Sequence, residues 1–361
     1  MKDRILSVDI FRGATIVLMI LVNTPGTWSN VFPPLLHAQW HGYTPTDLVF
    51  PFFLFIVGTS IVFAYKNKTI NSGTYKKISI RTLKLIGLGL FLGAFTISFP
   101  FIKQFADIRF PGVLQRIGVV FFFAAILFLN FKWKTLIGIT VGLLVGYWLL
   151  MTLVPVNGLE STLDRAPNNL ANWLDVQIFG SHNYKADYDP EGFLSTIPSI
   201  ASSLLGVFTG LILLSKQKKK ATILFGLGGA LLIIGHLWDF IFPINKALWT
   251  SSFVLVTAGW ANIILALIYY LTDIKKIKFG SIFRYAGANA IVVYFLSSFI
   301  SKIMGQIKVG DTSLHGWLFQ KVYVQNFMST ELSSLLYGLS VVAFYCLLAY
   351  FLYKRRIFIK V

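Results

Sequence analysis

The polar residues best suited to chemistry lie in one segment, Asn23 to Asp47, which joins the first two apolar runs. It contains His37, Trp40 and His41. Histidine is the usual general base near neutral pH, and in acyl transfer it can also act as a nucleophile. Aromatic neighbours can bind the flat face of a sugar. The alternative is structural, because tryptophan and tyrosine form belts at membrane interfaces and histidine is common at surfaces.

Asp47 has a structural and a functional interpretation. Thr44, Pro45 and Asp47 are typical of a capped helix start, with Thr44 as N-cap, Pro45 in the first turn and an acidic group at the positive helix end. The functional interpretation is that Asp47 orients a histidine. The two roles are compatible.

A second acidic segment precedes the sixth apolar run. Asp189 is expected to cap that helix, Pro190 to begin its first turn, and Glu191 to lie in that turn. The alternative is that these carboxylates bind an amine or hydroxyl of a substrate. The pattern does not separate the two.

Three further polar side chains fall at membrane depth. Asn23 and Arg116 lie near the ends of apolar runs, and Asn289 lies within one. Polar groups at such depth are costly and often functional. Interhelical hydrogen bonds are the structural alternative. Asp9 and Arg12 share a helix face and predict a local ion pair.

A metal site is not predicted. His37 and His41 have the spacing of two ligands on one helix turn, but Pro33, Pro34 and Gly42 indicate a loop, and no third ligand is evident. The sequence also lacks nucleotide-binding and zinc-protease motifs. Its basic residues occur in short loops between apolar runs, which indicates membrane topology and no nucleic-acid partner.

The elements that must position these residues are membrane-spanning helices. The chain of 361 residues is 56% hydrophobic and only 13% charged, with a mean hydropathy of +0.71. A bilayer-spanning helix needs about 20 mostly apolar residues. We therefore predict an all-α, polytopic membrane protein of about ten transmembrane helices. The runs are 6–23, 46–65, 80–99, 113–130, 134–154, 193–215, 221–242, 248–271, 281–304 and 332–353.

Charge placement predicts the orientation. The net charge is +18, and lysine and arginine concentrate in alternate loops and in the C-terminal tail. By the positive-inside rule, both termini are expected in the cytoplasm, with outer loops at 24–45, 155–192 and 305–331. All five histidines lie in these loops or near the predicted outer end of a helix. We expect a single transmembrane domain over 1–361 and a bacterial plasma (inner) membrane location.

Eight short segments, in the same order, resemble the heparan-α-glucosaminide N-acetyltransferase family. They begin with Ser7–Gly13, Val22–Asn23, His37–Gly42 and Asp47–Pro51. They continue with Pro111–Arg116, Tyr188–Gly192, Pro243–Trp249 and Gly287–Ala290. The segments span almost the whole chain. Each is weakly specific alone, and the ordered set is fairly specific.

The resemblance implies a transmembrane acyltransferase that uses cytosolic acetyl-CoA to acetylate the amino group of an amino sugar or glycan on the outer side. The family's active-site histidine falls on His37, and Asp47 is expected to orient it. The residues expected to contact acetyl-CoA are Asn23, Arg116 and Asn289. The residues expected to bind the acceptor are Trp40, His41, Asp189 and Glu191.

The alternative function is a transporter of amino sugars or related solutes that performs no chemistry. Aromatic outer loops and intramembrane polar residues would suit it. No inverted repeat is evident, however, and no pair of broken helices is expected. Membrane lipids surround either protein, and the sequence does not decide between a monomer and a homodimer.

Overall fold

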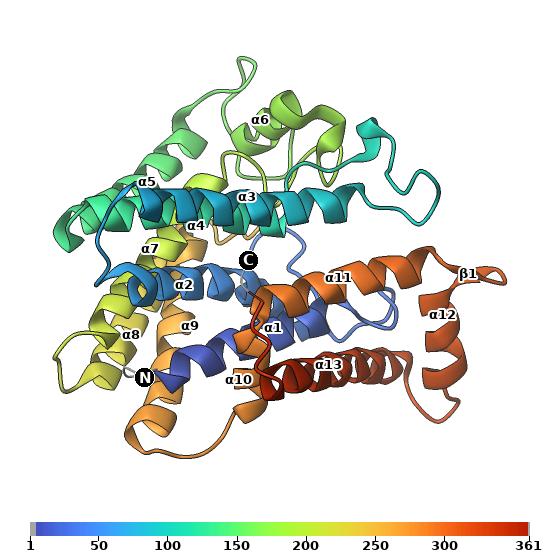
Figure 1. Ribbon diagram of the computed structural model, residues 1–361. Helices are drawn as coiled ribbons and strands as arrows, with labels where there is room; N and C mark the ends of the chain where they lie inside the picture. Colours follow the sequence, from blue (N-terminus) through green and yellow to red (C-terminus); the bar gives the residue numbers. More distant parts are fainter. Residues whose placement is uncertain (1–4, 360–361) are drawn as a thin grey trace.

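The computed structural model describes residues 5–359 and is predominantly helical (Figure 1). The long helices are α1 (Leu6–Asn23), α2 (Pro45–Tyr65), α3 (Ser72–Ala94), α4 (Val113–Asn130), α5 (Trp133–Leu153), α7 (Thr196–Leu213), α8 (Lys220–Asp239), α9 (Ser251–Tyr269), α11 (Ala290–Gln306) and α13 (Thr330–Lys354). The short elements are α6 (Leu170–Phe179), α10 (Ser281–Ala288), α12 (Leu314–Leu318) and the hairpin strands β1 (Lys308–Val309) and β2 (Thr312–Ser313). Every predicted apolar run falls on a helix, which confirms the all-α polytopic class.

Within residues 5–359, eight helices are long and apolar enough to cross a membrane, and the bent pair α10–α11 makes nine. The remaining long helix, α3, corresponds to the third predicted run. Its first half carries Lys76, Lys77, Arg81 and Lys84, which make it less apolar than the others.

The expectation of an unbroken ninth helix is wrong. Helices α10 and α11 meet at an angle of 81°. The break lies at Asn289, whose φ of −125° and ψ of 35° depart from helical values. A polar residue inside an apolar run was the only local signal of this break, because the hydropathy is continuous across it.

Helices α2 and α7 pack closely in the centre of the structure. A Cβ atom added to Gly206 would lie 1.9 Å from the backbone oxygen of Phe55, and one added to Gly58 would lie 1.8 Å from that of Ser203. Small residues permit this approach, as is common between membrane helices. Thr59 also donates a hydrogen bond of 3.0 Å to the Gly206 oxygen. Helix α2, which begins at the candidate site, is thereby fixed in the core.

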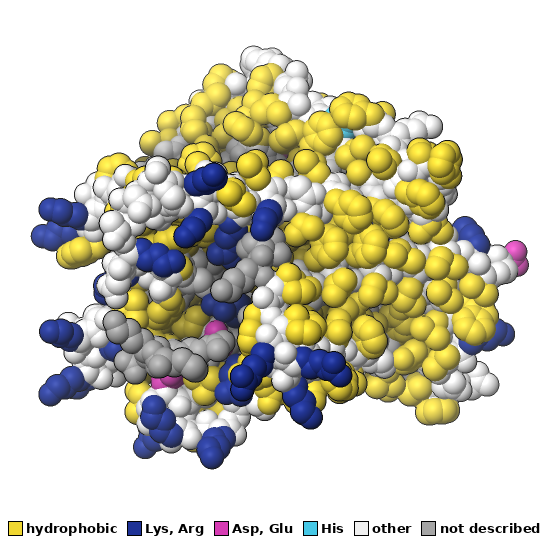
Figure 2. Space-filling view, viewed as in Figure 1, with side chains coloured by type: hydrophobic (Ala, Val, Ile, Leu, Met, Phe, Trp, Pro, Cys, Tyr) yellow, Lys and Arg dark blue, Asp and Glu magenta, His cyan; other side chains and the backbone are white. Residues whose placement is uncertain are grey.

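The three predicted outer loops correspond to segments with local structure. The first contains a 3₁₀ turn at Pro33–Leu35, the second contains α6, and the third contains the β1–β2 hairpin and α12. Lys and Arg side chains gather at the left end of the view in Figure 2, whereas hydrophobic side chains cover the surface over α11 and α13. This polarity agrees with the charge pattern, and the sidedness itself stays a prediction.

Candidate active site

The segment that carries His37 is held by two other loops. The Trp40 indole donates a 2.9 Å hydrogen bond to the Leu163 oxygen, and the Gly42 amide donates one of 2.7 Å to the Ile244 oxygen. Gly42 has a φ of +88°, a conformation that favours glycine. The expected loop geometry around His37 is therefore observed, and the loop is pinned on both sides.

Asp47 connects this loop to the start of α2. Its carboxylate lies 2.7 Å from His37 Nδ1 and accepts hydrogen bonds of 2.9 Å from the Ala38 and Thr44 amides. Thr44 is the N-cap of α2 and forms a capping box with Asp47. Both interpretations of Asp47 are thus satisfied by one side chain. Since the carboxylate is the acceptor, His37 Nδ1 donates and the lone pair lies on Nε2.

Lys246 is the member of this group that the sequence interpretation missed. Its Nζ lies 2.9 Å from His37 Nδ1, 3.1 Å from His37 Nε2 and 3.5 Å from Asp47 Oδ1. Burial lowers the pKa of Lys246 below its ordinary value, against the opposing attraction of Asp47 and Glu191. A lysine in a connecting segment otherwise poor in cations was the available signal.

A cavity of about 310 Å³, here called the histidine cavity, opens beside this group. Five predicted site residues line it, namely Asn23, His37, Trp40, Asp47 and Glu191. Among the lining residues that were not predicted are Arg109, Tyr184, Tyr188, Lys246 and Tyr294. The Trp40 and Tyr188 rings meet edge to face, with centroids 5.4 Å apart. The cavity thus combines a His–Asp pair, a lysine and several aromatic side chains.

His41 points elsewhere. Its Nε2 lies 3.0 Å from Asp164 Oδ1; the His41 side chain is 36% exposed and the Asp164 side chain 78%. It is absent from the lining of the histidine cavity. The acceptor-binding role of His41 stays a prediction.

Asp189 and Glu191 form an ion-pair network with Arg109. Arg109 Nε donates a 2.8 Å hydrogen bond to Asp189, and its terminal nitrogen contacts both carboxylates. Asp189 also accepts from the Tyr184 and Glu191 amides. Although burial opposes it, these carboxylates raise the Arg109 pKa above its ordinary value. Glu191 therefore lines the cavity. Asp189 does not line it and instead holds the backbone of the 184–191 segment.

The expected capping role of Asp189 is wrong. Helix α7 begins at Thr196, and its N-cap is Ser195. Asp189 instead begins a turn that precedes the helix. In this turn the Gly192 amide donates a 3.0 Å hydrogen bond to the backbone oxygen of Asp189. Pro190 therefore belongs to this turn, and the helix begins a few residues later than expected.

Arg116 is 2% exposed and does not line the histidine cavity. Its guanidinium donates hydrogen bonds of 2.9 Å to the backbone oxygens of Pro190 and Gly192. It thus fixes the 189–195 turn against α4. The acetyl-CoA contact predicted for Arg116 stays a prediction.

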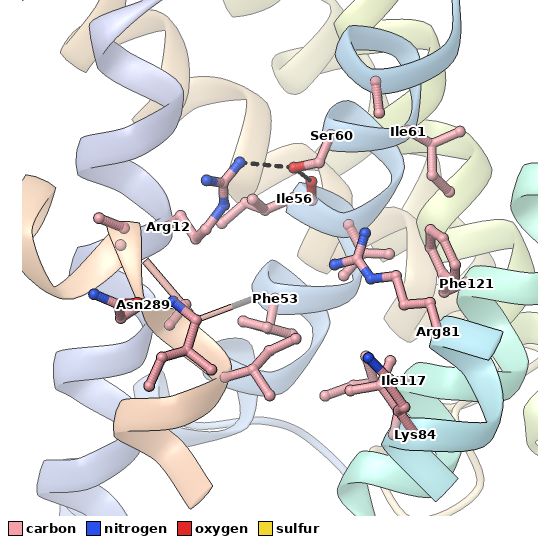
Figure 3. A pocket seen from close by; sticks show the side chains of 18 of the residues that line it. Arg12, Phe53, Ile56, Ser60, Ile61, Arg81, Lys84, Ile117, Phe121 and Asn289 are labelled. Carbon is pink, nitrogen blue, oxygen red and sulfur yellow. Dashed lines mark hydrogen bonds between the residues drawn. The ribbon is translucent and has the colours of Figure 1, made fainter. Parts of the chain in front are cut away.

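A second cavity of about 580 Å³, here called the basic pocket, lies among α1, α2, α3, α4 and the α10–α11 break (Figure 3). Arg12, Lys77, Arg81 and Lys84 line it, and no carboxylate is among its described lining residues. Buried Arg81 Nε has no hydrogen-bond partner in the described structure.

Two predicted polar residues border the basic pocket. Arg12 forms the expected pair with Asp9 at 3.2 Å and donates a 2.8 Å hydrogen bond to Ser60. The Asn289 amide group donates to the Ile357 oxygen at 2.9 Å and accepts from the Ile359 amide at 3.0 Å. The C-terminal segment is thereby held at the edge of the pocket, which Ile359 also lines.

The two cavities follow the same four helices. Phe50, Val113 and Tyr294 line the histidine cavity. Phe53, Ile117 and Ile291, each three or four residues away on the same helices, line the basic pocket. This separation is about 5 Å along a helix. Helix α1 likewise contributes Arg12 to one and Met19 to the other.

Fold and site together define a polytopic helical membrane protein with a His–Asp pair in a cavity near one end of its bundle. The family model "Heparan-alpha-glucosaminide N-acetyltransferase, catalytic" matches residues 4–238. The human heparan-alpha-glucosaminide N-acetyltransferase is 31% identical over 423 aligned residues, covering 100% of this chain and 60% of the human one. The mouse protein of that name is 30% identical over 420, covering 99% and 61%.

The chain therefore belongs to the heparan-α-glucosaminide N-acetyltransferase family. It spans about 60% of the length of these curated relatives. The resemblance inferred from the eight short segments is confirmed.

Asp175 gives a prediction on stability. This residue of α6 is 2% exposed and accepts a 2.8 Å hydrogen bond from the Phe193 amide. Burial raises its pKa to about 7, and nearby Asp189 adds to the effect. An acid whose pKa is raised by folding stabilises the protein at low pH, and that stability is lost as pH rises from its unfolded value to about 7.

We therefore expect Asp175→Asn, which stays neutral, to be more stable than the wild type above pH 7, by about 2–4 kcal/mol. The difference should shrink as the pH falls toward 4. Thermal unfolding in detergent across this range measures it. Asp187→Asn is the control, because its ion pair with Arg165 lowers the Asp187 pKa. A pH-independent effect of Asp175→Asn would contradict the argument.

Proposed function

We propose that this protein transfers an acetyl group from acetyl-CoA, bound in the basic pocket, to the amino group of an amino sugar or glycan in the histidine cavity. The observation that carries the proposal is the alignment of the two cavities along α1, α2, α4 and α11. The basic pocket has cations that can bind an anionic nucleotide. The histidine cavity has a base that can accept a proton from an amine.

The basic pocket suits the phosphates of acetyl-CoA. Its arginine and lysine side chains can form charge-assisted hydrogen bonds with phosphate oxygens, and buried Arg81 Nε would gain a partner. From Ser60 to Asp47, helix α2 extends about 20 Å. A long flexible pantetheine arm fits this distance, and apolar Phe53 and Ile56 line its start. Asn289 also lines the basic pocket.

His37 supplies the base. Its Nε2 lone pair, oriented by Asp47, takes a proton as the acceptor nitrogen bonds to the thioester carbonyl carbon. The C–S bond then breaks, and the proton that His37 has accepted passes to the departing coenzyme thiolate. The same nitrogen can instead carry the acetyl group transiently. Asn23 and Lys246 line this cavity and are the groups available to stabilise the developing oxyanion.

The acceptor site follows from the aromatic residues. Trp40, Tyr184 and Tyr188 present ring surfaces to a cavity whose size suits a single sugar unit. Glu191 at its wall provides a carboxylate for the acceptor amine or hydroxyls. Reaction across a bacterial plasma membrane, with the basic pocket on the cytoplasmic side, accords with the lysine and arginine distribution. These assignments define a single transferase domain over 1–361.

The transporter alternative gains one observation, the broken pair α10–α11. Broken helices border substrate sites in many transporters. Here the break at Asn289 borders the basic pocket. Counterflow of labelled amino sugar in proteoliposomes without acetyl-CoA would favour transport, whereas acetyl transfer favours the enzyme.

The first prediction on activity concerns His37. Purified protein in detergent should transfer radiolabelled acetyl from acetyl-CoA to glucosamine or short amino-glycans. His37→Ala should lower kcat at least about 100-fold, because it removes the proton acceptor. His236→Ala is the control, since exposed His236 bonds only to its own helix at the Leu232 oxygen. Equal rates for both variants would exclude the proposed role of His37.

The second prediction on activity concerns the basic pocket. The double variant Arg81→Gln/Lys84→Gln should raise the KM for acetyl-CoA about tenfold or more, with a smaller effect on kcat, because it removes two phosphate-binding charges. Steady-state kinetics in detergent provide the measurement. Lys275→Gln/Lys276→Gln removes the same charge from another basic segment and should leave the KM unchanged. An unaltered KM in the pocket variant would place the nucleotide elsewhere.

The third prediction on activity concerns Lys246. If its positive charge assists catalysis, activity should fall as pH rises through the pKa of Lys246, which burial lowers below the ordinary lysine range. Lys246→Arg keeps its charge and should lose this alkaline decline, although its rate is reduced. Lys246→Met should be slow at every pH, and Lys308→Met, on the exposed hairpin, should match the wild type. An identical alkaline limb in Lys246→Arg would refute the role.

A further inference from the structure

A large apolar groove lies apart from both cavities, between α5 and α8. The two helices touch at one end, where the Trp148 and Trp238 rings meet with centroids 5.9 Å apart. Toward the other end they separate, and side chains of α7 and α9 form the floor. The resulting groove has a volume of about 1470 Å³. This is the scale of a whole lipid molecule.

The walls of the groove are mostly hydrocarbon. They are formed by residues such as Ile137, Val141 and Leu227. The Thr140 hydroxyl donates to its own helix at the Leu136 oxygen. Asn262 is satisfied by Thr209 and by the Ala258 oxygen. With Thr140 and Asn262 already paired, this apolar part of the groove suits acyl chains better than a polar cofactor.

The open end of the groove is basic. Lys66, Lys132 and Lys134 line it, and no carboxylate is among the described lining residues. From Lys134 to Leu144, the groove follows α5 for about 15 Å. This is half of the roughly 30 Å hydrocarbon core of a bilayer. The groove therefore has the depth of one leaflet, with its cations at headgroup level.

We propose that this groove binds an anionic phospholipid of the leaflet on the basic side of the protein. The acyl chains lie between α5 and α8, and the phosphate contacts the lysines. Charge complementarity at the rim selects the headgroup, and the length of the apolar part selects a lipid of that leaflet. The lipid fills the space that α5 and α8 leave open. The site does not depend on the proposed acetyl transfer.

Native mass spectrometry of the delipidated full-length protein tests the proposal. It should be titrated with phosphatidylglycerol or with phosphatidylcholine of the same chains. The wild type should prefer phosphatidylglycerol. Lys132→Gln/Lys134→Gln should reduce this preference roughly 30-fold, since each lysine near an anionic surface contributes about a fivefold attraction. Lys275→Gln/Lys276→Gln, outside the groove, should retain it.

A second pair of variants tests the groove itself. Val141→Trp, which fills it, should abolish tight binding of both lipids, whereas Leu149→Trp, on the same helix outside the lining, should not. Equal affinity of the wild type for both lipids would overturn the proposal. So would retention of tight lipid binding by Val141→Trp, since the lipid would then lie outside the groove.

Discussion

The candidate site depends on one carboxylate at the beginning of one helix. Asp47 caps α2 through Thr44, accepts the Ala38 amide and binds His37 at 2.7 Å. Because α2 is locked against α7 by close glycine contacts, the histidine is fixed relative to the core of the bundle. Burial makes this rigid, since a carboxylate that is 1% exposed must keep its partners. The same contacts of Asp47 thus begin helix α2 and position the His37 ring.

The two cavities differ in the charges that line them, which accords with the two different substrates of the proposed reaction. Cations line the basic pocket without a carboxylate among its described residues, which favours an anionic ligand. The histidine cavity has mixed charge, with Lys246 beside the Asp47–His37 pair and with Arg109 bridging Asp189 and Glu191. Such a site can hold an amine and stabilise transient negative charge. Between the two lies about one helical turn of apolar and aromatic side chains.

Local sequence predicted the parts of the structure that local physics determines. Hydropathy located the helices, and the Thr44–Asp47 pattern predicted both a cap and a histidine partner. Asp189 was misread because a proline marks the start of a tight turn as readily as that of a helix. Lys246 was missed because it lies 209 residues from His37. The break at Asn289 was missed because the Asn289 side chain bonds to backbone groups of Ile357 and Ile359, which belong to the distant C-terminal segment.

In the proposed reaction, one acetyl-CoA molecule extends from the basic pocket to His37, and donor and acceptor enter from opposite sides. Proteoliposomes with uniformly oriented protein test this most directly. Labelled acetyl-CoA would be supplied on the side of the basic pocket and an amino sugar only inside the opposite compartment. Acetylated sugar in that compartment, absent with His37→Ala, is the predicted result. Product formed only when both substrates share one side would contradict the account.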